Sequence, residues 1–170
     1  MGTERLRGER VTLRPLEPAD AARLGEIAAE PEVARWWLEL SEQDILDKAG
    51  PDEDSLVFAI ELDGDLIGLA QAGEEDDPDY RHANMDLFLS TAWHGHGLGA
   101  DTVRTLAQWL FEARGHHRIT IDPAAANERA IRSYERVGFK RVGVMRRYER
   151  SAEGDWHDGL LLDLLPEDLR

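Results

Sequence analysis

The segment His94-Gly95-His96-Gly97-Leu98-Gly99 is the part of the sequence whose residue types and spacing most directly indicate chemistry. Its alternating glycines stand between a predicted strand and a predicted helix, where glycine lets the backbone pass close to a ligand and adopt positive φ without a steric penalty. The unpaired N–H groups at the start of the helix converge there, with the positive end of the helix dipole behind them. The segment therefore predicts a site for an anion such as a pyrophosphate.

Two classes of phosphate ligand compete for this segment. The spacing Gly95-x-Gly97-x-x-Ala100 matches the dinucleotide-binding pattern, and Asp122 follows about 20 residues on, where a ribose-binding acid belongs. A dinucleotide domain, however, normally opens with this pattern and continues with parallel βα units, whereas antiparallel hairpins are predicted before it here. A P-loop is excluded because no Lys-Ser or Lys-Thr follows the glycines. The context favours a ligand other than a dinucleotide.

The elements around this segment are predicted from hydrophobic periodicity and turn residues. Residues 10–16 alternate like a strand, residues 19–29 are rich in helix formers, and Ser41 is suited to cap a short helix. Further strands are predicted at 56–62, 66–72, 85–90 and 118–122, with an Asp63-Gly64 hairpin, a hydrophilic connection at 73–82, helices after Gly99 and over 127–136, and two closing strands around 151–155. This order predicts an α/β fold in a single domain over residues 1–170, with a mixed, mostly antiparallel sheet of about seven strands and helices on both faces.

The glycine segment resembles the phosphate-binding turn of the GNAT family of acetyltransferases, whose pattern is Arg/Gln-x-x-Gly-x-Gly/Ala. His94 stands where that family usually has Arg or Gln, and Thr91-Ala92-Trp93 replaces the usual Pro-x-Tyr/Phe. The resemblance implies a twisted sheet whose fourth and fifth strands splay apart, and a turn that holds the pyrophosphate of acetyl-coenzyme A (acetyl-CoA). The implied turn residues are His94, Gly95, His96, Gly97, Leu98, Gly99 and Ala100.

A second pattern lies on the next predicted helix. Asn127, Ile131 and Tyr134 share one helix face, and Asn127 is suited to cap the helix. Taken alone, a tyrosine here is more often a packing residue. The whole run, however, looks like the second GNAT signature: Asp122-Pro123 followed by Asn127-x-x-Ala130-Ile131-x-x-Tyr134-Glu135-x-x-Gly138-Phe139. In that family the Asn contacts the pantetheine arm of the coenzyme and the Tyr hydroxyl faces its thiol, so the resemblance places Asn127, Ala130 and Tyr134 at the coenzyme.

Acetyl transfer to an amine needs a neutral nucleophile, a stabilised oxyanion and a protonated leaving thiolate. Tyr134 is the candidate acid, because the pKa of a phenol, about 10, is near that of an alkyl thiol. Asp86 is the candidate base, since it interrupts an apolar strand and Asn84 occupies the position where many GNAT strands carry Glu. Asp122, at a strand end near the same cleft, is a second candidate, for orienting the ammonium group, and a water chain is a further alternative for the base. Asp86 points either into a cleft or to solvent on an open sheet face. The oxyanion donors that the resemblance implies are backbone N–H groups of Leu87, Phe88 and Leu89.

Several local features resemble the aminoglycoside 6'-N-acetyltransferases of this family, among them Arg35-Trp36-Trp37 and Gly68-Leu69-Ala70-Gln71. That resemblance implies an antibiotic-resistance enzyme whose sugar site brings carboxylates to ammonium groups. The implied lining is Trp36, Trp37, Gln71, Asp86 and Asp122. Residues 10–16 and 154–159 instead resemble protein N-terminal and polyamine acetyltransferases. A coenzyme-binding module without catalytic activity is a third alternative.

The composition is acidic and lacks cysteine. The 35 acidic and 20 basic side chains give a net charge of −15, which disfavours nucleic acid and favours a small cationic amine as partner. Absence of cysteine excludes disulfides and thiolate chemistry. Without an apolar run of membrane length or a secretory signal, a cytoplasmic monomer or homodimer with no membrane contact is expected. No metal is expected, because His94/His96 and His116-His117 lack further ligands at suitable spacing.

Overall fold

The structure, a computed structural model, describes residues 4–37, 40–49 and 56–170, so the first residues of the segment searched for a secretory signal lie outside it. The described residues form an eight-stranded sheet in the order β1-β2-β3-β4-β5-β6-β8-β7. Every pair of neighbours is antiparallel except β5 and β6, which are parallel. The predicted mixed, mostly antiparallel sheet is confirmed. The additional strand β1 has two residues, too few to show any periodicity in the sequence.

The strands and helices follow the predicted order, with bounds close to the predicted ones for most elements. The strands are β1 (Leu6–Arg7), β2 (Val11–Pro15), β3 (Leu56–Leu62), β4 (Asp65–Glu75), β5 (His82–Leu89), β6 (Ile119–Ile121), β7 (Lys140–Arg150) and β8 (Trp156–Leu164). The helices are α1 (Ala21–Ala28), α2 (Pro31–Ala34), α3 (Glu42–Lys48), α4 (Leu98–Glu112) and α5 (Glu128–Val137), with 3₁₀ turns η1 (Pro18–Asp20), η2 (Thr91–Trp93) and η3 (Pro166–Asp168). The short helix α2 was not predicted.

The predicted hydrophilic connection at 73–82 is shorter than expected. Residues 73–75 of β4 pair with Asn84, Ala83 and His82 of β5, so both strands extend into it. A strand ladder depends on backbone hydrogen bonds rather than on apolar side chains, and Glu74 is further held by Arg114 and His116. Polar composition alone therefore gave the wrong boundaries here.

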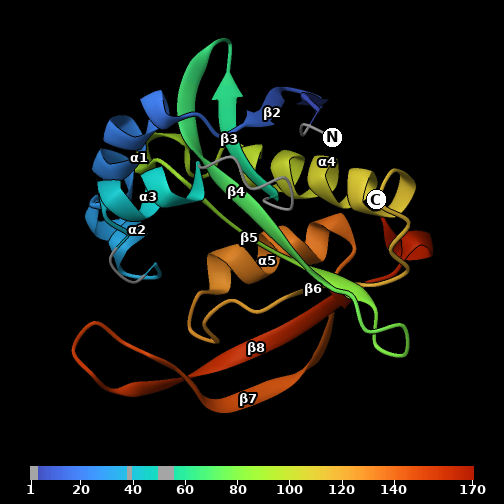
Figure 1. Ribbon diagram of the computed structural model, residues 1–170. Coiled ribbons are helices and arrows are strands. Elements are labelled where there is room, and N and C mark those ends of the chain that lie inside the picture. The colour runs from blue at the N-terminus through green and yellow to red at the C-terminus, as the bar shows by residue number, and fades with distance from the viewer. Residues whose placement is uncertain (1–3, 38–39, 50–55) are drawn as a thin grey trace.

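Helices cover both faces of the sheet, as predicted (Figure 1). On one face α4 and α5 pack against the strands through a core that includes Leu106 and Ile131. On the other face α1 and α3 bury Leu24 and Ile45. Each buried side chain of this size stabilises the fold by about 1.5–3 kcal/mol, so the two helical layers hold the sheet between them.

β5 and β6 are in contact only at their beginnings. Ala83 pairs with Ile119 and Asn84 with Thr120, and no later residue of β5 pairs with β6 in the described chain. β6 ends at Ile121, just before Asp122-Pro123, and proline has no N–H with which to continue a ladder. The two strands therefore separate and leave an opening between them. They correspond to the fourth and fifth predicted strands, at 85–90 and 118–122, so the predicted splay is confirmed.

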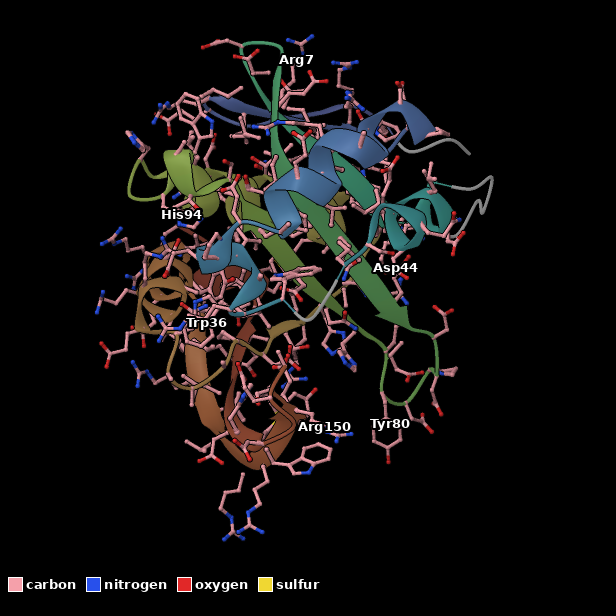
Figure 2. The ribbon with its side chains drawn as sticks, turned by 90° about the vertical axis from the view of Figure 1, so that its left-hand side faces the viewer. Arg7, Trp36, Asp44, Tyr80, His94 and Arg150 are labelled. Atoms are coloured by element: carbon pink, nitrogen blue, oxygen red, sulfur yellow. The ribbon has the colours of Figure 1, made fainter. Side chains whose placement is uncertain are left out.

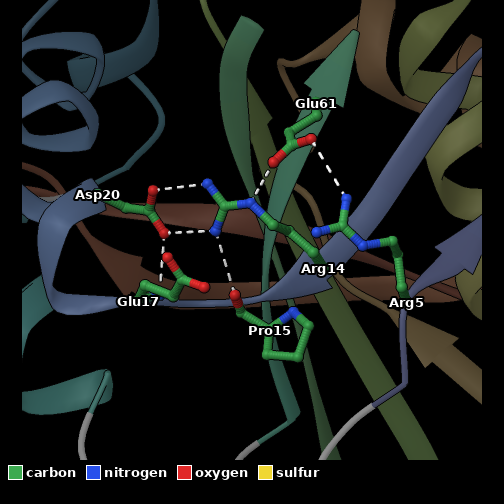
Figure 3. Close-up of polar contacts among 6 residues, drawn as sticks. All are labelled: Arg5, Arg14, Pro15, Glu17, Asp20 and Glu61. Carbon is green, nitrogen blue, oxygen red and sulfur yellow. Dashed lines mark hydrogen bonds and ion pairs between the residues drawn. The ribbon is translucent and has the colours of Figure 1, made fainter. Parts of the chain in front are cut away.

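A largely buried ion cluster attaches the first helical layer to the sheet (Figure 3). Arg14 of β2 donates from Nη1 and Nη2 to the two carboxylate oxygens of Asp20, both at 2.7 Å, and also bonds Glu61 of β3. Burial by itself would raise the pKa of Asp20, but the hydrogen bonds from Arg14 and from the Glu17 backbone N–H hold that pKa below its usual value. The cluster fixes η1, and therefore the start of α1, against β2.

Asp101 attaches α4 to the turn between β1 and β2. Its side chain is buried, and its carboxylate accepts backbone N–H groups from Glu9 at 2.9 Å, Arg10 at 2.7 Å and Val11 at 2.9 Å. These amides would otherwise lack a partner in the sheet. From the same turn, Arg10 Nη1 donates to the His96 carbonyl at 2.8 Å. The β1–β2 turn thus holds both α4 and the glycine segment before it.

We expect Asp101→Ala to destabilise the fold by about 3 kcal/mol, because three amide donors lose a charged acceptor while the helix propensity of the site improves. Urea unfolding followed by circular dichroism measures this loss. Glu26→Ala, on the exposed side of α1, is the control and should change the free energy of unfolding by less than about 0.5 kcal/mol. Equal stability of the two variants would contradict the role given to Asp101.

Candidate active site

A cavity of about 730 Å³ lies in the opening between β5 and β6, bounded by α2, α4, α5 and the β7–β8 hairpin. Figure 2 shows Trp36 and His94, both of which line it, on the same side of the molecule. The predicted site residues in its lining are Trp36, Trp37, Asp86, Leu87, Phe88, Leu89, His94, Gly95, Gly97, Leu98, Gly99, Asp122, Asn127, Ala130 and Tyr134. The two sequence motifs therefore meet at one cavity.

Three predicted site residues lie outside this lining. His96 packs its ring against Trp93, with centroids 5.9 Å apart, and Ala100 packs against the core beneath α4. Gln71 pairs with Asp86 across β4 and β5, but its side chain accepts a hydrogen bond from Lys48 Nζ at 3.2 Å. Gln71 is thus a neighbour of the cavity rather than part of its wall.

The glycine segment forms the open end of α4. Gly95 and Gly97 have φ values of 78° and 77°, in the left-handed region that favours glycine, and Gly97 is the N-cap of the helix. No side chain caps this end, and the acid in the first turn, Asp101, is committed to the β1–β2 turn. The first amides of α4 are therefore available to an anion in the cavity.

His94 holds the end of β5. Its Nε2 lies 2.8 Å from the Leu89 carbonyl, which can only accept, so the ring proton is on Nε2. Burial lowers the pKa of His94, assisted by the nearby Arg129 and opposed by the bond to Leu89. The ring is thus neutral near pH 7 and does not replace the positive charge of the Arg that the family pattern often has here.

Positive charge comes instead from three arginines of α5, which were not among the predicted site residues. Arg129, Arg132 and Arg136 all line the cavity, at helical spacings of three and four residues. Ala130 and Ser133, also in the lining, are small and leave room between this helix and α4. The i, i+3, i+7 arrangement of arginines beside small residues was the signal that could have identified them.

The opposite end of the cavity is acidic. Asp86, Asp122 and Glu149 line it, whereas Glu32, also in the lining, lies near His94. The Asp86 side chain remains accessible to water from the cavity, yet enclosure by the protein raises its pKa to about 7, and the charges of Asp122 and Glu149 add to this rise. Asp86 therefore points into a cleft, and its carboxyl group changes charge near neutral pH.

Two residues of the β7–β8 hairpin, Tyr148 and Glu149, complete the acidic end and were not predicted. The Tyr148 hydroxyl donates to Asp122 Oδ2 at 2.6 Å, and this bond, together with burial, raises the pKa of Tyr148 to about 12. Both residues belong to a strand whose pairing is irregular, so the sequence periodicity of β7 did not indicate which side chains face the cavity.

Tyr134 reaches the cavity from α5 and is 7% exposed. Burial, assisted by the charges of Asp86 and Asp122, raises its pKa above the ordinary value for tyrosine. No described residue forms a hydrogen bond with its hydroxyl, so the O–H is available to a ligand. Asn127 caps α5 as predicted, accepting the Ala130 N–H at 3.4 Å.

The wall of β5 offers few free backbone groups. Asp86 Oδ1 accepts the Leu87 N–H at 2.9 Å, and the Leu87 carbonyl accepts Trp37 Nε1 at 3.2 Å. The Ser90 N–H donates to the Ile67 carbonyl of β4. Successive residues of an antiparallel strand direct their N–H groups to opposite sides, so the Leu89 N–H points toward the opening. Of the predicted donors, Leu89 is the one whose N–H the geometry leaves for a ligand.

Glu30, which directly precedes α2, attaches the segment that carries Trp36 and Trp37 to the residues between β5 and the glycine segment. Glu30 accepts the Thr91 backbone N–H at 2.7 Å and the Ser90 hydroxyl at 2.9 Å. Trp37 also packs edge-on against Phe88 of β5, with ring centroids 5.0 Å apart. The segment around α2 and the end of β5 therefore form one continuous wall of the cavity.

Two further predictions concern metal and membrane. No group of three His, Cys, Asp or Glu residues in the described ranges is arranged to hold a metal ion. His116 is buried and lies 2.5 Å from Glu74, on the side of the β4–β5 hairpin. None of the helices in the described chain has the length and apolar character needed to cross a membrane.

Known proteins resemble this chain over most of its length. The sequence profile of the acetyltransferase (GNAT) domain matches residues 10–140. An aminoglycoside N(6')-acetyltransferase type 1 of Klebsiella pneumoniae is 32% identical over 155 residues, covering 79% of this chain and 76% of the relative. The spermidine N(1)-acetyltransferase of Escherichia coli K12 is 27% identical over 141 residues, covering 79% and 75%.

A solved structure agrees with the fold. The crystal structure of aminoglycoside acetyltransferase AAC(6')-Ib in complex with coenzyme A and kanamycin matches with a TM-score of 0.75 at 28% identity, over 93% of this chain and 96% of that one. Both motifs, the strand splay and the profile match point to the same conclusion. The chain belongs to the GNAT family of acetyltransferases.

Proposed function

We propose that this GNAT N-acetyltransferase transfers the acetyl group of acetyl-CoA to the 6'-amine of an aminoglycoside. The observation that carries the proposal is the division of charge within one cavity. Arginines and open helix amides line one end, which suits the phosphates of a coenzyme, and three carboxylates, Asp86, Asp122 and Glu149, line the other, which suits a polycationic amine. The 32% identical aminoglycoside relative supports the same choice.

The residues at the anion end fit coenzyme A. The left-handed Gly95 and Gly97 and the uncapped start of α4 present backbone donors, and Arg129 and Arg132 lie beside them. The side-chain oxygen of Asn127 accepts the hydrogen bond of the helix cap, so its amide N–H groups can donate to the pantetheine arm. When bound, acetyl-CoA supplies the acetyl group and the sulfur leaving group.

Asp86 is the proposed general base. A base works best when its pKa lies near the working pH, and the raised pKa of Asp86, about 7, meets this condition. Its carboxylate takes a proton from the substrate ammonium, directly or through one water, so that the amine becomes a nucleophile. Asp122 and Glu149 lie on the same side and attract the remaining ammonium groups.

Leu89 and Tyr134 are proposed to meet the other two requirements of acetyl transfer, which are a stabilised oxyanion and a protonated leaving thiolate. The Leu89 N–H is placed to donate to the developing oxyanion at the opening of the sheet. Because the pKa of Tyr134 is raised above that of a free phenol, its hydroxyl stays protonated throughout the neutral range. It therefore donates toward the departing sulfur, with a less balanced proton transfer than an unperturbed phenol would give.

The second candidate substrate is a linear polyamine, favoured by the spermidine acetyltransferase relative. Purified protein is incubated with acetyl-CoA and kanamycin, spermidine or a basic peptide with a free N-terminus, and release of coenzyme A thiol is measured. We expect kcat/KM for kanamycin to exceed that for spermidine at least about tenfold, through pocket complementarity. A preference for spermidine would support the second candidate, and coenzyme binding without turnover of any amine would support a module that is not an enzyme.

We expect kcat/KM to rise with pH through a midpoint near 7, because protonated Asp86 cannot accept a proton and its carboxylate predominates above that pH. Asp86→Asn should lower kcat about 100-fold and abolish this midpoint, while ionisation of the amine itself remains visible at higher pH. Rate profiles between roughly pH 5.5 and 9.5 measure both effects. Persistence of the midpoint in Asp86→Asn would assign it to another group.

We expect Tyr134→Phe to lower kcat at least about tenfold with little change in the affinity for coenzyme A, because only the hydroxyl is removed. Steady-state kinetics and calorimetric titration of coenzyme A measure the two quantities. Tyr80→Phe is the matched control, since Tyr80 is 74% exposed and lies away from Trp36 and His94 (Figure 2). An unchanged kcat in Tyr134→Phe removes Tyr134 from the mechanism.

A further inference from the structure

The pairing of β7 with β8 is interrupted beside the cavity. Met145 pairs with Gly159, and the next pair is Glu149 with His157. Residues 146–148 of β7 therefore stand opposite Asp158 alone. Such a bulge bends the strand and changes the direction of its side chains. In this protein it lies directly before Glu149, a residue of the acidic end of the cavity.

The bulge has an unusual backbone held by a specific side chain. Arg147 has φ of 48°, in the left-handed region that residues other than glycine seldom adopt. Its backbone N–H donates to Asp158 Oδ1 at 2.8 Å, so the one residue facing the bulge also fastens it. Backbone strain of this kind persists only where the surroundings over-determine it.

The bulge directs Tyr148 across β8 toward Asp122. Gly159 makes this possible, because a Cβ there would lie 2.9 Å from Tyr148 Cδ1. The ring crosses the space above this glycine, and the hydroxyl donates to Asp122 Oδ2 at 2.6 Å. Tyr148, Glu149 and Asp122 all line the cavity at its acidic end.

We propose that the β7 bulge makes Tyr148 a positioning residue for substrate selection: its hydroxyl fixes Asp122 so that Asp122 and Glu149 bind a second ammonium group, and the enzyme selects amines carrying more than one. The inference rests on the proposed function and adds to it the residue that positions Asp122, and a dependence of substrate selection on that residue. Asp86 receives the amine that must become neutral, whereas Asp122 pairs with one that stays charged.

The hydrogen bond accounts for how Tyr148 acts. Tyr148 is the hydrogen-bond partner that the described chain provides for the Asp122 side chain. With Oδ2 engaged, rotation of the carboxylate is restricted, and Oδ1 accepts no hydrogen bond from the described chain. A pre-oriented acceptor binds a cation more tightly, because the ordering of the side chain has already occurred in the free protein.

The test compares two sugars that share a 6-amino group. Kanamycin carries several ammonium groups, whereas methyl 6-amino-6-deoxyglucoside carries one. In Tyr148→Phe, which keeps the ring and removes the hydroxyl, we expect KM for kanamycin to rise about tenfold, with kcat within about twofold and KM for the single amine unchanged. Tyr80→Phe, remote from the site, controls for loss of a hydroxyl as such.

A double-mutant cycle separates positioning from a general structural role. If Tyr148 acts through Asp122, Tyr148→Phe has no further effect on KM for kanamycin in an Asp122→Asn background. Gly159→Ala, which displaces the Tyr148 ring, should reproduce the Tyr148→Phe effect. Thermal unfolding of each variant verifies that the protein is folded under assay conditions.

The possible failures are distinguishable. An equal rise in KM for both sugars, or the same rise in the Asp122→Asn background, overturns the role of Tyr148 and leaves the proposed function standing. Wild-type protein that acetylates neither sugar overturns the proposed function. Calorimetric titration of coenzyme-bound protein then still tests the second-cation site, because a tenfold weaker kanamycin affinity in Tyr148→Phe supports it and an unchanged affinity overturns it.

Discussion

The separation of β5 from β6 is the constraint on which the rest of the site depends. Two residue pairs hold the strands together, and Pro123 ends the possibility of a longer ladder. Beyond that point β5 keeps its hydrogen bonds to β4 on one side and has an open edge on the other. An open edge inside a protein requires other partners, which Trp37, His94 and the Asp86 carboxylate supply. Ligands enter where these partners leave space.

The opening also divides the cavity by charge. The α5 arginines and the start of α4 approach it from one side, and carboxylates from β5, from the residue after β6 and from β7 approach it from the other. Enclosure by the protein and the charges of its neighbours disfavour the ionised form of Asp86, so its pKa is raised to about 7. The same arrangement gives the proposed general base a carboxyl group that changes charge near neutral pH. His94 is neutral and bound to Leu89, so the positive charge at the proposed anion site comes from α5 and the start of α4.

Local rules predicted those parts of the molecule in which local interactions dominate. Gly95 and Gly97 adopt positive φ, Asn127 caps α5, Ser41 caps α3, and Asp63-Gly64 forms the hairpin expected of it. The splay was expected only from family resemblance, since no residue pattern marks the point at which two distant strands part. The extension of β4 to Glu75, the strand β1 and the helix α2 were missed, because backbone pairing and short-range sterics define them without hydrophobic periodicity.

The sequence by itself determined the order of the strands and helices other than β1 and α2, the glycine segment, the second motif on α5 and a family resemblance that identified most of the cavity wall. The tertiary structure decided which charges share that cavity. Arg136, Glu32 and Tyr148 belong to three different elements, α5, α2 and β7. They line one cavity because of helix packing and a strand bulge held by Asp158. Register and bulges reflect a balance of contacts between distant segments, so residue spacing within one segment carries no information about them.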